Sequence, residues 1–488
     1  MKRWLALTLC ALAVAACQDR SGAGAPTAPA GPAAGLLGSG ARVDAVLASV
    51  LASAAPTDRL VVLVNFEEGL TTGTLLGDAV RATGAGVLTF RHLPVVAAAA
   101  TPAQVAAIRA LPGVSSVYAN RQLRYLLRES VQSIRADQVH DMGYTGKGVG
   151  IAILDSGIDG LYHPGVAYPG RTVQNVKLAA GMDDLGVFDG STPAVGGDLF
   201  VENTPNTDTS VGHGTHVAGI AAGDGGGSSA GSYRGVAPGA HLVGISAGDA
   251  IAVLWTLAGF DYVLENRAKY NIQVVNNSWG TTGAYDPEDP INRATRKVHD
   301  AGIAVVFAAG NEGPGPNTLN PYSAAPWVIS VAAGCKLHVS PEPTGSVSLC
   351  EDESNAGRAP LLAYFSSRGI PGDPLVHPDV TAPGANIVSS RAAFGLVMNG
   401  SDLTSDATTC NISLQHVDHY TCASGTSMSA PHVSGVIALM EEASRGRLTP
   451  DQALAALVRT ARPLPGYAEW EAGAGYVDAL AAVKAVRR

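Results

Sequence analysis

Three residues typical of nucleophilic catalysis occur in the order Asp155, His213 and Ser427. Asp155 ends an apolar run, where a buried carboxylate needs a partner and suits the orientation of a histidine. His213 lies between two glycines, which let backbone and substrate approach the ring closely. Ser427 precedes an apolar stretch with a helical pattern, and free N–H groups at a helix N-terminus stabilise a developing oxyanion. Together they could perform acyl transfer, with His213 taking the proton of Ser427 as the hydroxyl attacks a carbonyl carbon.

Each residue has a simpler interpretation when it is taken alone. Asp155 and Ser427 suit helix N-caps, which are common for both residue types. His213 and His216 are three residues apart, a plausible spacing for two zinc ligands on a helix, but no Glu accompanies them as in His-Glu-x-x-His. His216 is therefore expected to be a packed core histidine. The combination of the three residues is far more specific than any one of them.

The segments around the three residues resemble the motifs of the subtilisins. They read Asp-Ser-Gly-Ile-Asp from Asp155, His-Gly-Thr-His-Val-Ala-Gly from His213, and Gly-Thr-Ser-Met-Ser-Ala-Pro-His around Ser427. The order Asp, His, Ser also differs from the orders in chymotrypsins and α/β-hydrolases. The resemblance covers roughly residues 58–485. It implies a serine endopeptidase with Asp155, His213 and Ser427 as its catalytic triad.

The resemblance also assigns residues around the triad. Asn311 matches the oxyanion-hole asparagine of the family, although alone it would suit a turn before glycine. Ser278, Trp279 and Gly280 resemble the strand that pairs with an extended peptide. Such pairing makes proteins and peptides the expected substrates.

The sequence allows a structural calcium site but does not identify its ligands. Gly165 stands where many subtilisins have an aspartate that contributes to a strong calcium site, which puts that site in doubt. The acidic residues Asp183, Asp184 and Asp189 are an alternative, and solvated acids are the simpler interpretation. The acyl-transfer chemistry itself is expected to need no cofactor.

The region from residue 131 alternates short apolar runs with helical patterns. The predicted strands are Gly150–Leu154, Ala240–Ile245, Gln273–Asn276, Ala304–Ala308 and Trp327–Ala332. The predicted helices are Val217–Ala222, Ala250–Tyr270, Asn292–Ala301 and Val433–Glu442. This pattern predicts an α/β fold, a parallel sheet with helices on both faces. Active sites in such sheets lie at the carboxyl ends of the strands, which is where Asp155 and Asn311 occur.

Residues 58–125 have the pattern of a small α+β domain. Strands are predicted at Arg59–Phe66, Val87–Phe90, Val95–Ala98 and Val114–Asn120, and helices at Leu75–Ala82 and Pro102–Leu111. The order βαββαβ is ferredoxin-like. The subtilisin propeptide has this topology, and the segment Leu-Pro-Gly-Val from Leu111 resembles its end. The resemblance implies an intramolecular inhibitor and folding chaperone, cleaved between about Asn120 and Arg135 from a catalytic domain at 131–488.

The N-terminus has the features of an export signal. Two basic residues precede the 13-residue apolar run Trp4–Ala16, which is too short to span a bilayer. The run ends Val-Ala-Ala-Cys, which resembles a bacterial lipobox with Cys17 as the acylated residue. The alternative is ordinary signal cleavage after Ala15. We assign 1–17 to the signal peptide and 18–57 to a flexible linker, because Ser21–Gly40 contains almost nothing bulky.

Composition and charge exclude other classes of protein. Hydrophobic residues make up 46% of the 488 residues, which excludes global disorder. The net charge is −9 without a basic patch, so nucleic acid is not an expected partner. Residues 1–40 and 41–130 each carry +2, which leaves −13 for residues 131–488. The basic propeptide could therefore attract the acidic catalytic domain.

Four cysteines remain besides Cys10 and Cys17, and they lie in two apparent insertions. Cys335 and Cys350 are in the first insertion, and Cys410 and Cys422 are in the second. An even number in an exported protein suggests disulfides, with three possible pairings. One bridge within each insertion is the simplest of them.

The expected function is that of a monomeric exported endopeptidase, and two other functions are alternatives to it. A catalytically silent binding protein would keep the fold, but the intact triad and Asn311 speak against it. An exopeptidase would differ in leaving internal bonds of casein uncut. We expect the precursor to be lipid-anchored and the mature enzyme to be periplasmic or extracellular in a bacterium.

Overall fold

The computed structural model describes residues 41–67, 74–90, 92–120, 124–125, 132–178, 199–228, 233–248, 251–336, 349–350, 361–395, 398, 410 and 412–488. Cys17, Asp183, Asp184 and Asp189 lie outside this part of the chain. In the part described, no helix is both long enough and apolar enough to cross a membrane.

The first folded region contains the six elements predicted for it, in the predicted order. Its elements are β1 (Arg42–Val43), α2 (Ala45–Ser53), β2 (Leu60–Phe66), α3 (Thr74–Arg81), β3 (Gly86–Thr89), β4 (Val95–Ala100), α4 (Pro102–Arg109) and β5 (Val114–Ala119). The sheet order is β1-β5-β2-β4-β3, with β2 antiparallel to both neighbours. Thr101 and Gln104 form a capping box at the start of α4.

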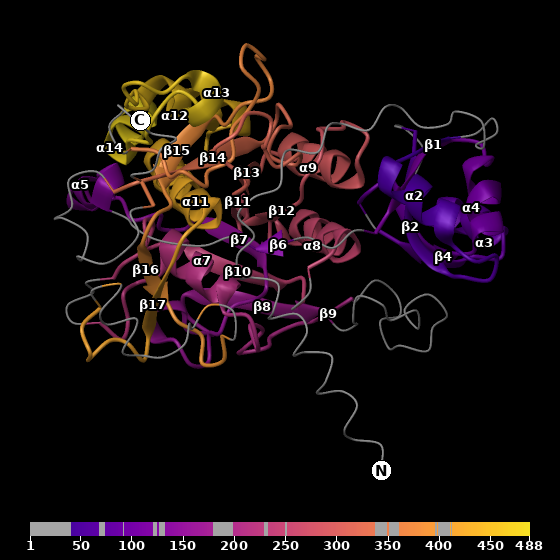
Figure 1. The fold of residues 1–488 in the computed structure, drawn as a ribbon. Helices are drawn as coiled ribbons and strands as arrows, with labels where there is room; N and C mark the ends of the chain where they lie inside the picture. Colours follow the sequence, from indigo (N-terminus) through magenta and orange to yellow (C-terminus); the bar gives the residue numbers. More distant parts are fainter. Residues whose placement is uncertain are drawn as a thin grey trace. The chain divides into compact units, whose positions relative to one another are not determined.

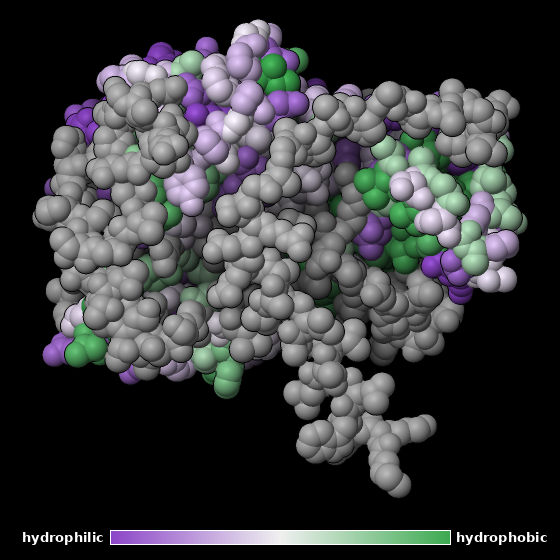
Figure 2. Space-filling model, in the orientation of Figure 1, coloured by the Kyte–Doolittle hydropathy of each residue, from purple (hydrophilic) through white to green (hydrophobic). Residues whose placement is uncertain are grey.

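The end of the expected linker is folded, in contrast to the prediction of 18–57 as a flexible segment. Asp44 caps α2 through the N–H groups of Val46 and Leu47, and Leu47 is buried. Strand β1 adds to the sheet edge beside β5. Val46 and Val50 stay partly exposed, and Figure 2 shows hydrophobic residues on the visible surface of this region. One well-capped helix with an apolar side chain facing a sheet was enough to order the segment.

An eight-stranded sheet forms the centre of the larger region (Figure 1). Its strands are β7 (Gly150–Asp155), β8 (Thr172–Leu178), β9 (Phe200–Val201), β10 (His241–Ser246), β11 (Ile272–Asn277), β13 (Ala304–Ala308), β14 (Ile329–Gly334) and β15 (Val380–Pro383). The order is β15-β14-β13-β11-β7-β10-β8-β9, and all neighbours are parallel except β8 and β9. The predicted strands all form, with ends shifted by one or two residues.

Helices cover both faces of this sheet, as the sequence predicts. The helices of this region are α5 (Ala136–Asp141), α7 (His213–Ala222), α8 (Val253–Asn266), α9 (Pro290–Asp300), α11 (Thr426–Ser444), α12 (Pro450–Thr460), α13 (Glu469–Ala472) and α14 (Ala479–Val486). Ile151 and Ile153 of β7 belong to the hydrophobic cluster that includes α7 and α11. Ala152 and Leu154 belong to the cluster with α8 and α9. The alternation of side chains along one strand therefore supplies both cores.

Two short antiparallel pairs complete the region. Strand β16 (Ile387–Ser390) pairs with β17 (Tyr420–Ala423), and β12 (Trp279–Gly280) pairs with β6 (Arg124–Tyr125). Cys335 is bonded to Cys350 and Cys410 to Cys422, which confirms the simplest predicted pairing.

Candidate active site

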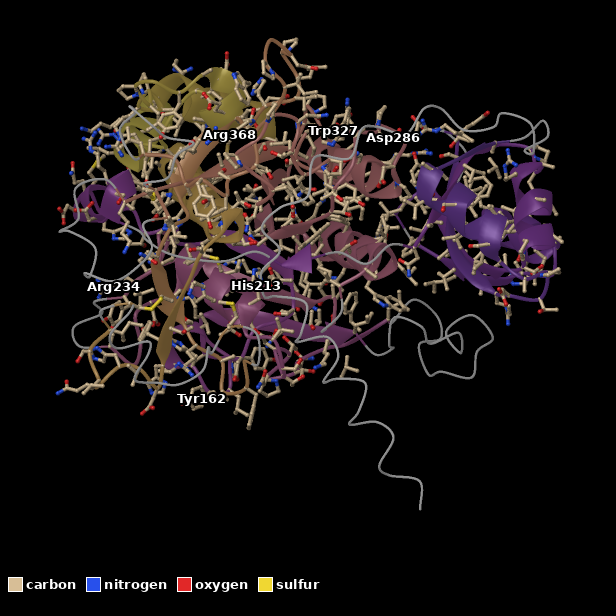
Figure 3. The ribbon with its side chains drawn as sticks, viewed as in Figure 1. Tyr162, His213, Arg234, Asp286, Trp327 and Arg368 are labelled. Atoms are coloured by element: carbon tan, nitrogen blue, oxygen red, sulfur yellow. A yellow bond between two sulfur atoms is a disulfide. The ribbon has the colours of Figure 1, made fainter. Side chains whose placement is uncertain are left out.

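The three candidate catalytic residues come from three different elements of the larger region. Asp155 is the last residue of β7, His213 is the first residue of α7, and Ser427 is the second residue of α11. Both helices begin beside the carboxyl ends of the central strands, and Figure 3 labels His213 there. The fold therefore places the three motifs at the edge of the sheet where active sites of such folds occur.

Asp155 and His213 form a buried hydrogen-bonded pair. The Nδ1 atom of His213 lies 2.7 Å from Oδ1 of Asp155, and both side chains are fully buried. The same Oδ1 accepts the backbone N–H of Ser156 at 2.8 Å. Because Asp155 accepts at Nδ1, Nε2 is the ring nitrogen that can act as a base.

Ser427 is held by the residue at the end of a neighbouring strand. Its hydroxyl donates to the carbonyl oxygen of Ser278 at 2.8 Å, and the Ser278 hydroxyl donates to the carbonyl oxygen of Ser427 at 2.7 Å. Ser278 directly follows β11. The first turn of α11 also leaves backbone N–H groups without partners inside the helix, which suits an anion beside Ser427.

Asn311 lies next to the serine motif, although it is 116 residues earlier in the chain. Its Oδ1 atom accepts the backbone N–H of Thr426 at 3.1 Å and the Thr426 hydroxyl at 3.0 Å. The Thr426 hydroxyl also accepts the N–H of Gly310 at 3.0 Å. With its oxygen fixed in this way, the amide of Asn311 keeps its NH₂ group for another acceptor.

The segment Ser278-Trp279-Gly280 forms part of a strand pair. Strand β12 pairs antiparallel with β6, with Trp279 opposite Tyr125 and Gly280 opposite Arg124. A segment from before the larger region thus adds a strand beside Ser278. Main-chain pairing of this kind is β-augmentation, the mode of peptide binding expected for this segment.

The surroundings of Trp279 and Gly280 explain why these residues offer only their backbone for pairing. The Trp279 ring is fully buried, donates to the carbonyl oxygen of Leu154 at 2.8 Å and packs edge-on against Phe307. A Cβ on Gly280 would lie 2.3 Å from the amide nitrogen of Asn320. That amide donates to the carbonyl oxygen of Trp279 at 3.1 Å, so glycine is required for the close approach.

His216 is a core residue, in agreement with the sequence interpretation. It is fully buried, and its Nε2 lies 3.1 Å from the carbonyl oxygen of Ile387. Burial, followed by the charge of His213, lowers the pKa of His216 to about 3, so the ring stays neutral. Among the described residues, no group of three His, Cys, Asp or Glu side chains could hold a metal ion.

Sequence reasoning missed several residues that support the site. Thr426 fixes Asn311, Asn320 fixes the β12 backbone, and Asp208 bonds to the segments around Asp155 and His213. None of the three is marked by spacing, because their partners Asn311, Trp279 and Ser156 are at least 41 residues away in sequence. Only Thr426 belongs to a motif that the sequence singled out.

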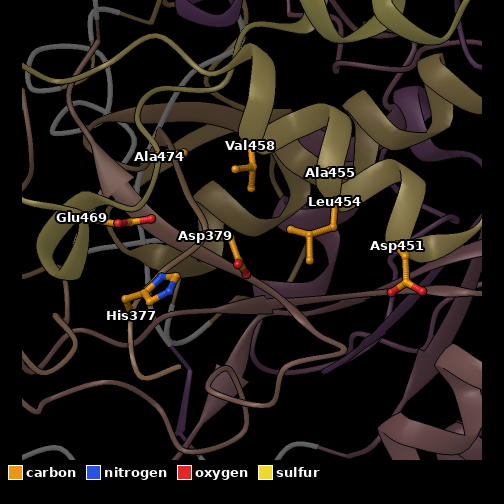
Figure 4. A pocket seen from close by; sticks show the side chains of 8 residues that line it. All are labelled: His377, Asp379, Asp451, Leu454, Ala455, Val458, Glu469 and Ala474. Carbon is orange, nitrogen blue, oxygen red and sulfur yellow. The ribbon is translucent and has the colours of Figure 1, made fainter. Parts of the chain in front are cut away.

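A cavity of about 340 Å³ lies elsewhere and contains none of the candidate catalytic residues. Figure 4 shows its lining residues, which are His377, Asp379, Asp451, Leu454, Ala455, Val458, Glu469 and Ala474. Burial raises the pKa of Asp379 to about 6. The Asp379 carboxylate accepts the N–H of Ser330 at 2.7 Å, which gives it a structural role beside β14.

Comparisons with known proteins agree with this geometry. Serine protease AprX of Bacillus subtilis (strain 168) is 28% identical over 415 residues, covering 81% of each chain. The major intracellular serine protease of the same strain is 28% identical over 360 residues, covering 72% of this chain and 87% of that protein.

The solved structures show the same fold. The crystal structure of fervidolysin from Fervidobacterium pennivorans, a keratinolytic enzyme related to subtilisin, matches with a TM-score of 0.60 and 20% identity. The match covers 87% of this chain and 61% of that one. The model of the subtilase family matches residues 146–477, about two thirds of the sequence. This chain therefore belongs to the subtilase family of serine proteases.

Proposed function

We propose that the chain is an exported serine endopeptidase whose nucleophile is Ser427. The observation that carries the assignment is the buried 2.7 Å pair of His213 and Asp155 at the edge of the sheet where α11 presents Ser427. The Ser427 hydroxyl turns from the Ser278 carbonyl oxygen to Nε2 of His213, which takes its proton during attack on a peptide carbonyl. Asp155 fixes the tautomer of the imidazole. Water then releases the acyl-enzyme.

Asn311 stabilises the oxyanion in this mechanism. Its NH₂ group and the backbone N–H of Ser427 donate to the oxygen that becomes negative in the tetrahedral intermediate. The two bonds from Thr426 to Oδ1 of Asn311 support the assignment, because they fix the amide before substrate binds. Only side chains, backbone groups and water take part, so the reaction needs no cofactor.

Residues 58–125 act as an inhibitor in the precursor. Their C-terminal segment β6 pairs with β12, the strand assigned to substrate, and so occupies the site as a peptide would. Asn65 of β2 donates to the carbonyl oxygen of Glu288 at 2.6 Å, and Asn120 accepts the N–H of Leu254 at 2.9 Å. Leu63 and Tyr118 join the hydrophobic cluster of α8 and α9. These contacts support a propeptide that binds its own catalytic domain.

Substrates bind as extended peptides along Ser278, Trp279 and Gly280. An open edge strand accepts a backbone anywhere along a protein chain, which favours an endopeptidase over an exopeptidase. Export is proposed from the N-terminal apolar run and lipobox, which lie outside the described residues.

The decisive experiment uses Ser427→Ala and a fluorophosphonate probe on the wild-type protein. The probe should label Ser427 of the wild type, and casein should be cut at internal bonds. Ser427→Ala should lose both properties and remain an uncleaved precursor. Maturation of Ser427→Ala in a preparation free of other proteases would rule out this nucleophile, and an unlabelled wild type would favour a silent binding protein.

A further inference from the structure

Asp208 is a fully buried acid that the mechanism above does not use. Its Oδ1 accepts the N–H of Gly212 at 2.8 Å and the hydroxyl of Ser156 at 3.0 Å. Its Oδ2 accepts the N–H of Thr215 at 3.0 Å and the Thr215 hydroxyl at 2.6 Å. These four bonds come from donors on two different segments and occupy the acceptor capacity of the carboxylate.

Through these partners Asp208 connects the segment that carries Asp155 to the segment that carries His213. Ser156 follows Asp155, and its hydroxyl also accepts the N–H of Gly214 at 2.8 Å. Gly212 and Gly214 flank His213. The N-cap position of α7 is Gly212, which has no side chain, so Asp208 and Ser156 satisfy the first N–H groups of this helix instead. A negative group at a helix N-terminus is also favoured by the helix dipole.

We propose that Asp208 is a positioning residue for catalysis, which clamps the start of α7 to the end of β7 and adds a second negative charge near the imidazole. The proposal rests on the function assigned to His213 above. Asp208 does not touch substrate, and it acts through Ser156, Gly212 and Thr215. A shift of the helix start relative to β7 would misalign His213, and small misplacements of a catalytic group are costly.

The charged groups around Asp208 set its response to pH. Asp155 faces it from β7 and His213 lies on α7, while Lys177 of β8 donates to the Thr209 hydroxyl at 2.6 Å. Asp159 reaches the network through its N–H, which donates to the Thr215 hydroxyl at 2.9 Å. Burial raises the pKa of Asp208 to about 6; bonds from Thr215 and Gly212 oppose the rise, and the Asp155 charge adds to it.

This environment predicts a steep loss of activity in acid. Above pH 6 Asp208 is ionised and accepts all four bonds. Below it a proton turns one acceptor oxygen into a donor that faces the neighbouring donors, so the clamp is lost as the pH falls through about 6. His213 can act as a base only while its ring is neutral, so acid also removes the base itself. Two protonations then remove activity together, and the acid limb of log kcat/KM should have a slope close to two.

The test compares Asp208→Asn with two other variants. Asparagine keeps the size of the side chain, but its NH₂ group faces a donor at one position. We expect kcat to fall about 10²-fold with KM within about twofold, and the acid limb to have a slope of about one and a lower midpoint, because a negative charge is lost. Ser156→Ala cuts the link to β7 but keeps the charge, so it should lower kcat while the slope stays close to two.

Asp289→Asn is the matched control, because Asp289 is a buried N-cap of another helix, α9. It should lower stability without changing the acid limb. If Asp208→Asn fails to mature, the titration midpoint of the His213 ring is followed by NMR in Ser427→Ala and in Ser427→Ala/Asp208→Asn precursors, and the second should be lower.

An unchanged slope and kcat in Asp208→Asn, or an unchanged midpoint in the precursors, would overturn the role of Asp208. Wild-type protein that fluorophosphonate does not label would instead overturn the proposed function, so the two failures are distinguishable.

Discussion

Hydrogen bonds inside the protein orient each candidate catalytic side chain without the help of a substrate. Ser156 donates to Asp155, Thr426 donates to Asn311, and Ser427 exchanges two bonds with Ser278. Donors that are already aimed at the developing charge need no reorganisation during the reaction. The energetic cost of orientation is therefore met during folding.

Asn311→Ala tests this preorganisation at the residue scale. The variant loses one oxyanion donor, and we expect kcat to fall about 10²–10³-fold, the size known for this donor in a subtilisin, with KM little changed. Steady-state kinetics on a peptide substrate measure both values. Thr318→Ala, which removes a hydroxyl from a nearby loop, serves as the control. A change mainly in KM would make Asn311 a residue that binds substrate in its ground state.

At the scale of elements, the pairing of β6 with β12 links the precursor to the chemistry of the site. Trp279 lies opposite Tyr125, and Trp279 directly follows Ser278, which bonds to Ser427. Because β6 is antiparallel to β12, the residues that follow Tyr125 approach Ser278. We therefore expect the bond nearest the nucleophile to lie after Tyr125.

N-terminal sequencing of the mature protein measures the position of this cut. We expect the first mature residue to lie between residues 126 and 135. Purification of the precursor in a protease-deficient host, with Ser427→Ala as the control, separates self-cleavage from cleavage by other enzymes. A mature chain that begins at or before Tyr125 would contradict the assigned direction of binding.

A polar cluster on the larger region contacts the first folded region. Arg42 and Tyr118 both bond to Asp286, which Figure 3 labels. Burial, followed by the hydrogen bond to Asp286 and its charge, raises the pKa of Tyr118. Arg293 of α9 adds bonds to the carbonyl oxygen of Phe66 and to the Ser115 hydroxyl. Partly exposed ion pairs of this kind weaken as salt screens them.

Asp286→Asn should weaken retention of the cleaved propeptide. The side chain keeps its size but loses the charge that attracts Arg42, so less propeptide should elute with the mature enzyme in gel filtration at low salt. Wild type should approach the variant as salt rises. Asp300→Asn is the matched control, because Asp300 bonds to its neighbours Arg296 and His299 on the same helix. Equal retention by Asp286→Asn and wild type at low salt would show that the apolar contacts suffice.

At the scale of the whole molecule, the proposed cleavage would change the location of the enzyme. A lipid on Cys17 would lie on the same side of the cut as the propeptide. The catalytic domain would therefore leave its anchor when the precursor is processed, unless propeptide contacts retain it. The +2 charge of residues 41–130 and the −13 of residues 131–488 favour retention at low ionic strength.

Cell fractionation tests the anchor and the release separately. We expect wild-type activity in the soluble fraction and Ser427→Ala precursor in the membrane pellet. Cys17→Ala should move the Ser427→Ala precursor out of the pellet. Soluble Ser427→Ala precursor with Cys17 intact would refute the anchor, and mature enzyme that stays in the pellet at high salt would refute the release.

The sequence by itself determined the family, the fold class and the identity of the candidate catalytic residues. Asp155, His213 and Ser427 each lie in a long motif whose residues are neighbours in sequence, so local reading was sufficient. The predicted strands β7, β10, β11, β13 and β14 are short apolar runs bounded by turn residues. Such runs strongly indicate buried strands. Each predicted disulfide also joins cysteines that are close in the chain, and a short loop favours such a pairing.

The tertiary structure decided the contacts that depend on distant segments. Asp208 carries no motif, and its role depends on the bond to Ser156, 52 residues earlier, which joins the nearby Gly212 and Thr215 to β7. The pairing of β6 with β12 joins residues about 155 apart, and the ordering of α2 depends on a sheet that closes later in the chain. Burial and hydrogen-bond partners are properties of the packed state. A sequence pattern can reveal periodicity along one element, but it carries no record of which buried donors another element will bring.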